Sequence, residues 1–357
     1  MMKKVILYTD NLGPGGAQRQ LIGLAYLLSK EYNVKVLCYY DNPFYVSFLK
    51  EKNIKYELIK NGNNILKRII FTLLVVIKEK PNTLIAYQET PSIIACLTRF
   101  FFPFFKLIVS ERNTTQKMTI KEKIRFNLFR ISDYVVPNSY TQETFIIKNC
   151  PFLASKTITI SNFVQLNHFT PLYHRTNKPF RIIVAASVIP SKNTLKFIEA
   201  VRCVNSKSSR PFIVEWFGIH NYPSTYLNQC QKYISDNNLN NVFHLLPKTK
   251  NIVREYQTAD ALCLPSLFEG TPNTICEGIA CGLPIICSDI CDNSRFVHDG
   301  INGFTFDPTS IESMSNAITR LLNLNDKEII DFGQYSRTLA CKELSERKFL
   351  NEYLKII

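Results

Sequence analysis

Two glutamates, eight residues apart, form the densest group of candidate reactive side chains in the sequence. Glu269 and Glu277 lie in Pro265–Pro284, which reads PSLFEGTPNTICEGIACGLP. Carboxylates in such a segment can accept hydrogen bonds from the hydroxyl groups of a sugar or a ribose. Two simpler roles fit about as well: Glu269 could complement a helix dipole, and Glu277 could be a solvated helical position. A hydrolase acid–base pair would need the two carboxyl groups to face each other across a water-filled site.

A short helix is predicted to begin between the two glutamates. Thr271 suits the N-cap, Pro272 suits the first helical position, and Gly282 suits the C-terminal end. The backbone amides of residues 271–274 and the positive end of the helix dipole then form a site for an anion such as phosphate. This setting favours a phosphate-containing ligand over a pair of hydrolytic carboxyls.

The elements that must position this site are short strands alternating with helices along the whole chain. Continuous apolar strands between helices predict parallel sheets covered on both faces. The first half contains the predicted strands 5–9, 34–40, 83–87, 107–110 and 134–137. The second half contains the predicted strands 181–186, 212–217, 242–245, 261–265, 284–288 and 303–306. Helical spacing is found in residues 18–30 and 191–205, among others.

The strand and helix pattern starts afresh after a polar segment. Residues 171–180, PLYHRTNKPF, predict a linker, and a new strand follows them. We therefore expect an α/β protein with two doubly wound Rossmann-like domains facing a central cleft, comprising residues 1–170 and residues 181–337. A C-terminal helix over 338–357 is expected to pack back toward the first domain. Ligands of such open sheets bind beyond the carboxyl ends of the strands, where the two glutamates lie.

The net charge of +14 is concentrated in the first half of the chain. Residues 1–172 contain 23 basic and 11 acidic residues, while the remainder contains 20 and 18. Such an asymmetry indicates an anionic partner for the first half, either a membrane surface or a nucleic acid. The 46% of apolar residues and 20% of charged residues exclude a disordered chain.

Two segments of the first half interleave basic and apolar residues. They are Arg99–Lys106, RFFFPFFK, and Lys117–Arg130, KMTIKEKIRFNLFR. A cationic amphipathic surface with aromatic residues is typical of peripheral membrane contact, whereas a core helix with a solvated basic face gives the same pattern. Across the whole half, the charge favours the membrane. No recognised nucleic-acid-binding module accompanies it.

Cysteine spacing and hydropathy exclude two other classes of protein. The 11 cysteines form no paired framework and the sequence begins without a secretory signal, so we expect reduced thiols in a cytoplasmic protein. Cys276, Cys281, Cys287 and Cys291 lie close in sequence but form no CxxC, which favours buried small hydrophobic residues over a metal site. The longest apolar run, residues 69–77, is too short to cross a bilayer.

The glutamate-containing segment FEGTPNTICEGIACGLPIICSD resembles the donor-site motif of the retaining glycosyltransferases of family 4, which have the GT-B fold. Four further segments resemble that family in the same order along the chain. NLGPGGAQRQ is similar to its glycine-rich loop after the first strand, and ISNFVQLNHFTP to its interdomain segment. SVIPSKN is similar to the loop that opens its second domain, and VHDGINGFTFDP to a later stretch. The resemblance therefore covers both halves of the chain. It implies that residues 1–170 form the acceptor-side domain and residues 181–337 the nucleotide-sugar-binding domain.

The resemblance implies a role for each matching residue. Glu269 would contact the transferred sugar and the charge developing at its anomeric carbon, and Glu277 would bind the ribose of the nucleotide. Lys192 would act with Glu269 in catalysis by holding the diphosphate, since donors aimed at the leaving group are a large catalytic contribution. The other residues implied in donor binding are Gly15, Gly16, Ser187, Gly270, Thr271, Pro272 and Asn273. Without the resemblance, Gly15 and Gly16 indicate an ordinary strand-to-helix turn and Lys192 a solvated lysine.

The sequence departs from the family at two places. Ser187 stands where the family usually has an arginine, which weakens the expected diphosphate clamp unless another cation compensates. The acceptor-side loop reads VSERNTTQ where many members have a histidine, as in a familiar "SERN" variant of the family. Glu111 could orient an acceptor hydroxyl, Arg112 could bind an acceptor phosphate, and Asn113 lies beside them. A local Glu–Arg–Asn network that closes the loop is an equally good interpretation.

The resemblance implies retaining, metal-independent transfer of a hexosyl group from a nucleotide diphosphate sugar, carrying UDP or GDP, to a glycan or lipid-linked glycan. No cofactor and no nucleic-acid partner is expected. The implied setting is the synthesis of surface polysaccharide such as O-antigen or capsule, at the inner face of the cytoplasmic membrane. A nucleotide-sugar epimerase of the same fold and a non-catalytic subunit that binds nucleotide or membrane stay open as alternatives. Ser187 favours the non-catalytic subunit.

Overall fold

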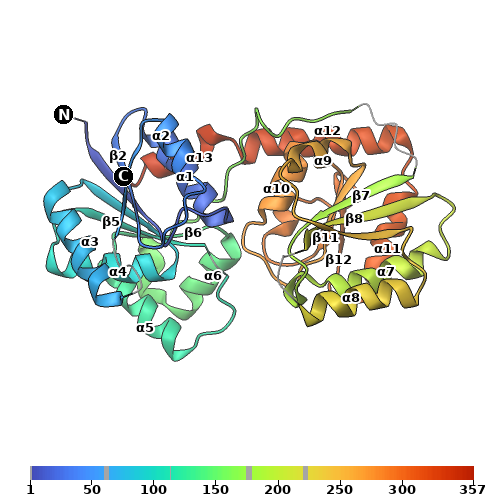
Figure 1. Ribbon diagram of the computed structural model, residues 1–357, viewed down its shortest axis with the longest axis horizontal. Helices are drawn as coiled ribbons and strands as arrows, with labels where there is room; N and C mark the ends of the chain where they lie inside the picture. Colours follow the sequence, from blue (N-terminus) through green and yellow to red (C-terminus); the bar gives the residue numbers. More distant parts are fainter. Residues whose placement is uncertain (1, 60–63, 113, 174–178, 220–223) are drawn as a thin grey trace. The chain divides into compact units, whose positions relative to one another are not determined.

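The computed structural model describes residues 2–59, 64–112, 114–173, 179–219 and 224–357. The chain divides into two compact units (Figure 1). Unit 1 comprises Met1–Asn162 together with Glu346–Ile357, and unit 2 comprises Phe163–Ser345. The chain therefore leaves unit 1 after Asn162 and returns to it at Glu346. The sequence analysis placed its linker at 171–180, of which 174–178 lie outside the described residues.

Unit 1 contains a six-stranded sheet in which all neighbouring strands are parallel. Its strand order is β3-β2-β1-β4-β5-β6. This order reverses direction at β1, as doubly wound sheets do, and places the loops after β1 and β4 at the switch point. The strands are β1 (Lys4–Tyr8), β2 (Asn33–Cys38), β3 (Lys55–Leu58), β4 (Thr83–Tyr87), β5 (Lys106–Glu111) and β6 (Tyr134–Pro137).

The helices of unit 1 cover its sheet and share a core with it. The side chains of α3, α4 and α5 pack in one apolar cluster with residues of the sheet, so these helices lie on the same face (Figure 1). α13 returns to contact α1. The helices are α1 (Gly16–Leu28), α2 (Val46–Glu51), α3 (Ile65–Glu79), α4 (Glu89–Phe101), α5 (Ile120–Leu128), α6 (Tyr140–Asn149) and α13 (Glu346–Leu354), with 3-10 turns η1 (Phe129–Ile131) and η2 (Pro151–Lys156).

Unit 2 repeats the same topology. Its parallel sheet has the order β12-β11-β10-β7-β8-β9, which read from the other edge is the order of unit 1. The prediction of two doubly wound α/β sheets is thus confirmed. The strands are β7 (Phe180–Ala185), β8 (Phe212–Ile219), β9 (Phe243–Pro247), β10 (Ala261–Leu264), β11 (Ile285–Ser288) and β12 (Gly303–Phe306).

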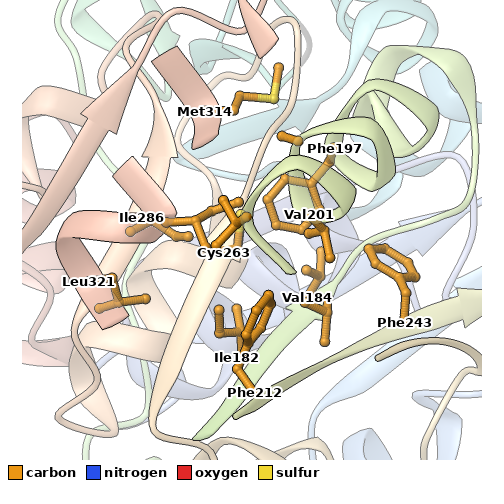
Figure 2. Close-up of a cluster of buried hydrophobic side chains, with 14 of the residues drawn as sticks. Ile182, Val184, Phe197, Val201, Phe212, Phe243, Cys263, Ile286, Met314 and Leu321 are labelled. Atoms are coloured by element: carbon orange, nitrogen blue, oxygen red, sulfur yellow. The ribbon is translucent and has the colours of Figure 1, made fainter. Parts of the chain in front are cut away.

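One core of unit 2 lies between its sheet and the helices α7 and α11 (Figure 2). Ile182 and Val184 from β7 meet Phe197 and Val201 from α7 in this core. All four side chains are completely buried. The helices are α7 (Thr194–Asn205), α8 (Thr225–Asp236), α9 (Ile252–Thr258), α10 (Asn273–Ala280), α11 (Ile311–Leu322) and α12 (Asp326–Glu343), with 3-10 turns η3 (Pro190–Lys192) and η4 (Asn293–Arg295).

Most strand predictions agree with the structure. The predicted strands 83–87, 134–137 and 303–306 have the observed bounds, and the others differ by one or two residues at an end. The sequence analysis missed β3, whose sequence KYEL alternates charged and apolar residues at the edge of the sheet. It also predicted a single helix over 338–357, whereas the structure ends α12 at Glu343 and begins α13 at Glu346.

Within the described part of the chain, no helix combines the length and apolar character needed to cross a bilayer. Three of the clustered cysteines, Cys276, Cys281 and Cys287, are buried in an apolar core of unit 2, as expected of small hydrophobic side chains. Cys291 is partly exposed.

Candidate functional site

The predicted donor-site residues of unit 2 lie on loops that are tied to one another. The loop after β10 is joined to η3, because the amide of Leu267 donates to the carbonyl of Ser191 at 2.9 Å. The start of α10 is joined to the end of β7, because Thr274 Oγ1 donates to the carbonyl of Ala185, also at 2.9 Å. These bonds gather the carboxyl ends of β7 and β10, neighbouring strands of the sheet, into one region.

Lys192 and Glu269 form an ion pair in this region. The Lys192 ammonium group donates to Glu269 Oε1, and Ser266 Oγ donates to the same oxygen at 2.6 Å. The side chains are 24% and 14% exposed, so water reaches both but screens neither completely. The structure thus holds the two predicted catalytic residues against each other, 77 positions apart in sequence.

The helix α10 begins one residue later than predicted. Pro272, and not Thr271, is its N-cap, and Asn273 is its first residue. Pro272 itself has an extended backbone, with φ −76° and ψ 108°, so the helical conformation starts only at Asn273. Thr271 is buried, and Gly270 and Asn273 are half-buried. Glu269, which pairs with Lys192 of η3, lies shortly before Asn273, the first residue of α10, and the anion site at this helix N-terminus stays a prediction.

Glu277 is a buried residue of α10, which excludes the solvated helical position considered above. Tyr256 from α9 donates its hydroxyl hydrogen to Glu277 Oε2 at 3.1 Å. Tyr256 is itself fully buried in the apolar core that α9 and α10 share. This hydrogen bond orients Oε2 of the buried carboxylate.

Ser187 follows β7 and is half-buried. It lies in a crowded turn, because a Cβ atom added to Gly218 would come within 1.8 Å of the carbonyl oxygen of Ala186. The indole of Trp216 donates to that same carbonyl at 2.6 Å. The backbone beside Ser187 is therefore fixed by its neighbours on β8, and only a glycine fits at 218.

The glycine-rich loop of unit 1 is ordered by its own hydrogen bonds. Gly15 is the N-cap of α1 and its amide donates to the carbonyl of Gly13 at 2.9 Å, so this amide is already engaged. Gly16 is the first residue of α1. Gln18 donates to Asp10 Oδ1 at 2.8 Å and closes the loop over the end of β1.

Glu111 ends β5 and is almost completely buried. Arg125 Nη2 lies 3.3 Å from Glu111 Oε2, while Arg125 Nη1 lies 2.8 Å from Glu89 Oε1. One buried guanidinium therefore faces two carboxylates. Burial raises the pKa of the Glu111 carboxyl to about 7, and the positive charge of Arg125 opposes this increase.

Arg112 is engaged in a network within unit 1. Its guanidinium donates to Asn162 Oδ1 at 3.1 Å and to the Tyr353 hydroxyl at 2.7 Å. The central carbon of the guanidinium, Cζ, lies 4.2 Å from the ring centre of Tyr87. The hydroxyls of Tyr87 and Tyr353 are 2.8 Å apart. These contacts of Arg112 are with Asn162 and Tyr353, whereas Glu111 pairs with Arg125, so the local Glu–Arg–Asn network and the phosphate site both stay predictions. Asn113 lies outside the described residues.

Sequence reasoning missed three residues that shape these sites. Tyr256 and Ser266 each donate a hydrogen bond to one of the two glutamates. Neither carries a charge, and Ser266 lies in the segment Pro265–Pro284 without standing out among its residues. Arg125 looked like one of several surface cations on a helix, although it is 1% exposed. The available signal was its place directly before Phe126, which is also buried. In the described residues, no group of three His, Cys, Asp or Glu side chains lies close enough to hold a metal ion.

The chain is similar to known proteins over both units. Residues 173–338 match the family described as "Glycosyl transferases group 1". The UDP-Gal:alpha-D-GlcNAc-diphosphoundecaprenol alpha-1,3-galactosyltransferase of Escherichia coli is 29% identical over 180 residues, which cover 46% of this chain and 45% of that protein. The N-acetylgalactosamine-N,N'-diacetylbacillosaminyl-diphospho-undecaprenol 4-alpha-N-acetylgalactosaminyltransferase of Campylobacter jejuni is 22% identical over the full length of both proteins.

A solved structure shares the fold. The crystal structure of HepE from Anabaena in complex with UDP superposes with a TM-score of 0.85 at 16% identity, covering 99% of each chain. At this identity the likeness concerns the architecture: two parallel six-stranded sheets with helices, as in GT-B proteins.

Proposed function

The chain belongs to the glycosyl transferases group 1 family and is a glycosyltransferase, and from this premise we propose that it transfers a hexosyl group from a nucleotide diphosphate sugar, with retention of anomeric configuration. The proposed acceptor is a glycan carried on a lipid diphosphate. The match to this family confirms the resemblance that the sequence predicted. The comparisons support a nucleotide-sugar donor, and retention and the hexose are our inference.

The observation that supports this most is the Lys192–Glu269 pair directly before the N-terminus of α10. A donor diphosphate placed there would meet a cation and the positive end of a helix dipole. When the bond between the anomeric carbon and the diphosphate oxygen breaks, the electron pair stays on that oxygen. Preorganised positive groups at this point lower the barrier of that step.

The two glutamates would take different parts of the donor. Glu269 would leave Lys192 in part and accept hydrogen bonds from the transferred sugar, and its negative charge would stabilise the positive charge that develops at the anomeric carbon. Glu277, held by Tyr256, would accept hydrogen bonds from the ribose hydroxyls. Ser187, Gly270, Thr271, Pro272 and Asn273 would line the diphosphate.

The acceptor and location follow from the relatives and the charge. The printed names of the Escherichia coli and Campylobacter jejuni enzymes describe acceptors linked to undecaprenol diphosphate. A chain with 23 basic and 11 acidic residues in its first 172 positions suits such an acceptor and the anionic lipids around it. We therefore place the protein at the cytoplasmic face of the membrane, in the synthesis of surface polysaccharide.

Two measurements test the proposal: donor binding is measured first, and sugar transfer second. UDP- and GDP-sugars are screened for an increase in the melting temperature, since a ligand that binds only the folded state stabilises it. We expect one of these donors to stabilise the protein, and Glu269→Ala to abolish transfer while the protein stays folded. Glu312→Ala, at an exposed position of α11, is the matched control and should keep full activity.

Three outcomes would overturn the proposal. If none of the donors raises the melting temperature, the protein is not a nucleotide-sugar transferase. If the donor is turned over without an acceptor, the epimerase alternative holds, and if it binds but neither reaction occurs, the non-catalytic alternative that Ser187 favours holds.

A further inference from the structure

Helix α3 of unit 1 has two apolar faces. Arg68, Thr72, Val75 and Val76 form its buried face against the sheet. Leu66, Ile70, Leu74 and Ile77 on the opposite side, and Ile65 at the start of the helix, are large and aliphatic yet exposed. Leu66, Ile70 and Leu74 follow one another at intervals of four, so they form a continuous row along one side of the helix. A surface helix of a soluble protein normally carries polar residues there.

The next two helices also expose large apolar side chains. α4 packs against both α3 and α5, and all three bury their inner faces in the same core. The C-terminal end of α4 and the segment after it expose Phe100, Phe101 and Phe104, the last with 77% of its surface accessible. α5 exposes Ile120 and Ile124, again four residues apart. These ten side chains are called the α3–α5 surface below.

The charges around the α3–α5 surface have one sign. From residue 64 to residue 130, the exposed basic side chains are those of Lys67, Lys78, Lys80, Lys117, Lys121, Lys123 and Arg130. The four carboxylates of the same stretch are half-buried or buried and engaged: Glu79 with Lys4 and Lys35, Glu89 with Lys121 and Arg125, Glu111 with Arg125, and Glu122 with Thr119. The surface therefore offers exposed positive charge and no fully exposed negative charge.

We infer that the α3–α5 surface docks on an anionic lipid bilayer, with α3 lying in the plane of the headgroups. Helices of this kind bury aliphatic and aromatic side chains at the boundary of the acyl chains while lysines contact anionic headgroups. At 1.5 Å per residue, α3 is roughly 22 Å long, which suits a helix lying on the membrane and not one spanning it. A row of aliphatic side chains would not contribute to the binding of a nucleic acid, which presents phosphates and bases.

This inference rests on the proposed function and names the surface by which the enzyme would reach a lipid-linked acceptor. It also changes the assignment made from sequence. The basic residues of the segment 117–130 are not equivalent, because Arg125 is buried in ion pairs and takes no part in the surface. Conversely α3, whose apolar residues were too few to span a bilayer, contributes half of the apolar side chains.

The test is co-sedimentation of the full chain with vesicles. Phosphatidylcholine vesicles are compared with vesicles enriched in phosphatidylglycerol, using wild type, Ile70→Ser/Leu74→Ser and the control Ile330→Ser. Ile330 is an exposed isoleucine of α12 in unit 2. Wild type and control should bind the anionic vesicles. The double variant should bind them with an affinity about tenfold lower, or lower still. Raising the salt concentration should weaken wild-type binding, because it screens the lysines.

Stabilisation by nucleotide-sugar donors is measured on the same samples, so that the two proposals can fail separately. The inference is supported if the double variant loses vesicle binding while its donor-induced stabilisation equals that of wild type. It is overturned if wild type does not bind anionic vesicles, or if the double variant binds them as well as wild type. It is also overturned if wild type is a dimer in solution that the double variant dissociates, since the surface would then join two copies of the chain.

Discussion

The hydroxyl group of Tyr256 lies 3.1 Å from Oε2 of Glu277, and both side chains are buried in the core of unit 2. The tyrosine comes from α9 and the glutamate from α10, so the bond joins two helices as well as two side chains. A buried carboxylate without such a donor would lose much of its orientation. Tyr256 is therefore a positioning residue for the proposed ribose contact.

Tyr256→Phe tests this role. The variant keeps the ring and its packing but removes the hydrogen bond. We expect the KM for the donor to rise about tenfold with little change in kcat, because the lost orientation affects binding of the nucleotide and not the reacting bond. Tyr335→Phe is the control, since its hydroxyl bonds His298 at the surface. A lowered kcat with unchanged KM would contradict the positioning role.

The ion pair of Lys192 and Glu269 predicts non-additive effects on stability. Removing one partner leaves the other charge in a partly buried position, whereas removing both leaves none. Lys192→Met and Glu269→Gln should each lower the free energy of unfolding, and the double variant should lose less than the sum of the two. We expect a coupling of about 1–2 kcal/mol, measured by urea denaturation of the four proteins. Additive losses would mean that water already screens the pair.

The buried carboxyl of Glu111 makes stability depend on pH. Its pKa in the folded protein is about 7, above the value of an unfolded chain, so the folded state binds the proton more tightly. The stability that this group contributes is complete below the unfolded pKa and is lost as the pH rises through 7. Between pH 5 and pH 8, wild type should lose up to about 3 kcal/mol more than Glu111→Gln, which cannot ionise. Parallel curves for the two proteins would show that Arg125 keeps Glu111 ionised throughout.

Tyr353 attaches α13 to the rest of unit 1. Its hydroxyl contacts both the Tyr87 hydroxyl and the Arg112 guanidinium, and all three groups are buried. Tyr353→Phe should destabilise unit 1 by about 1–3 kcal/mol, because both partners lose a hydrogen bond without gaining water. Hydrogen exchange of the amides in Glu346–Leu354 measures this directly. Exchange as slow as in wild type would indicate that apolar packing alone holds the helix.

The sequence predicts the sheets well because their strands are continuous apolar runs. The missed strand β3 shows the limit: Lys55 and Glu57 interrupt its pattern, and Glu57 is stabilised by Lys35 on the neighbouring strand. That partner is 22 positions away and becomes visible only when the strands pair. The ends of α10 illustrate a smaller error, since propensity alone does not decide between Thr271 and Pro272 as the N-cap.

The residues of the candidate site likewise fall into those that the sequence predicts and those that it does not. Its charged residues could be found from motif spacing, because Glu269, Glu277 and Lys192 follow strands of unit 2. Their partners Tyr256 and Ser266 could not, because a hydroxyl becomes informative only when its distance to a carboxylate is known. Arg125 was assigned to the surface for a related reason: the two carboxylates that balance its charge, Glu89 and Glu111, belong to other elements.

The division of the chain has a consequence for the order in which the protein acquires its structure. Unit 2 is a continuous segment, Phe163–Ser345, inserted into unit 1, whose closing segment begins at Glu346. During synthesis on the ribosome, unit 2 is therefore complete while unit 1 still lacks α13. Until Tyr353 emerges, Tyr87 and Arg112 lack the hydrogen bonds that it makes with them. Unit 2 can finish folding first although it is made second.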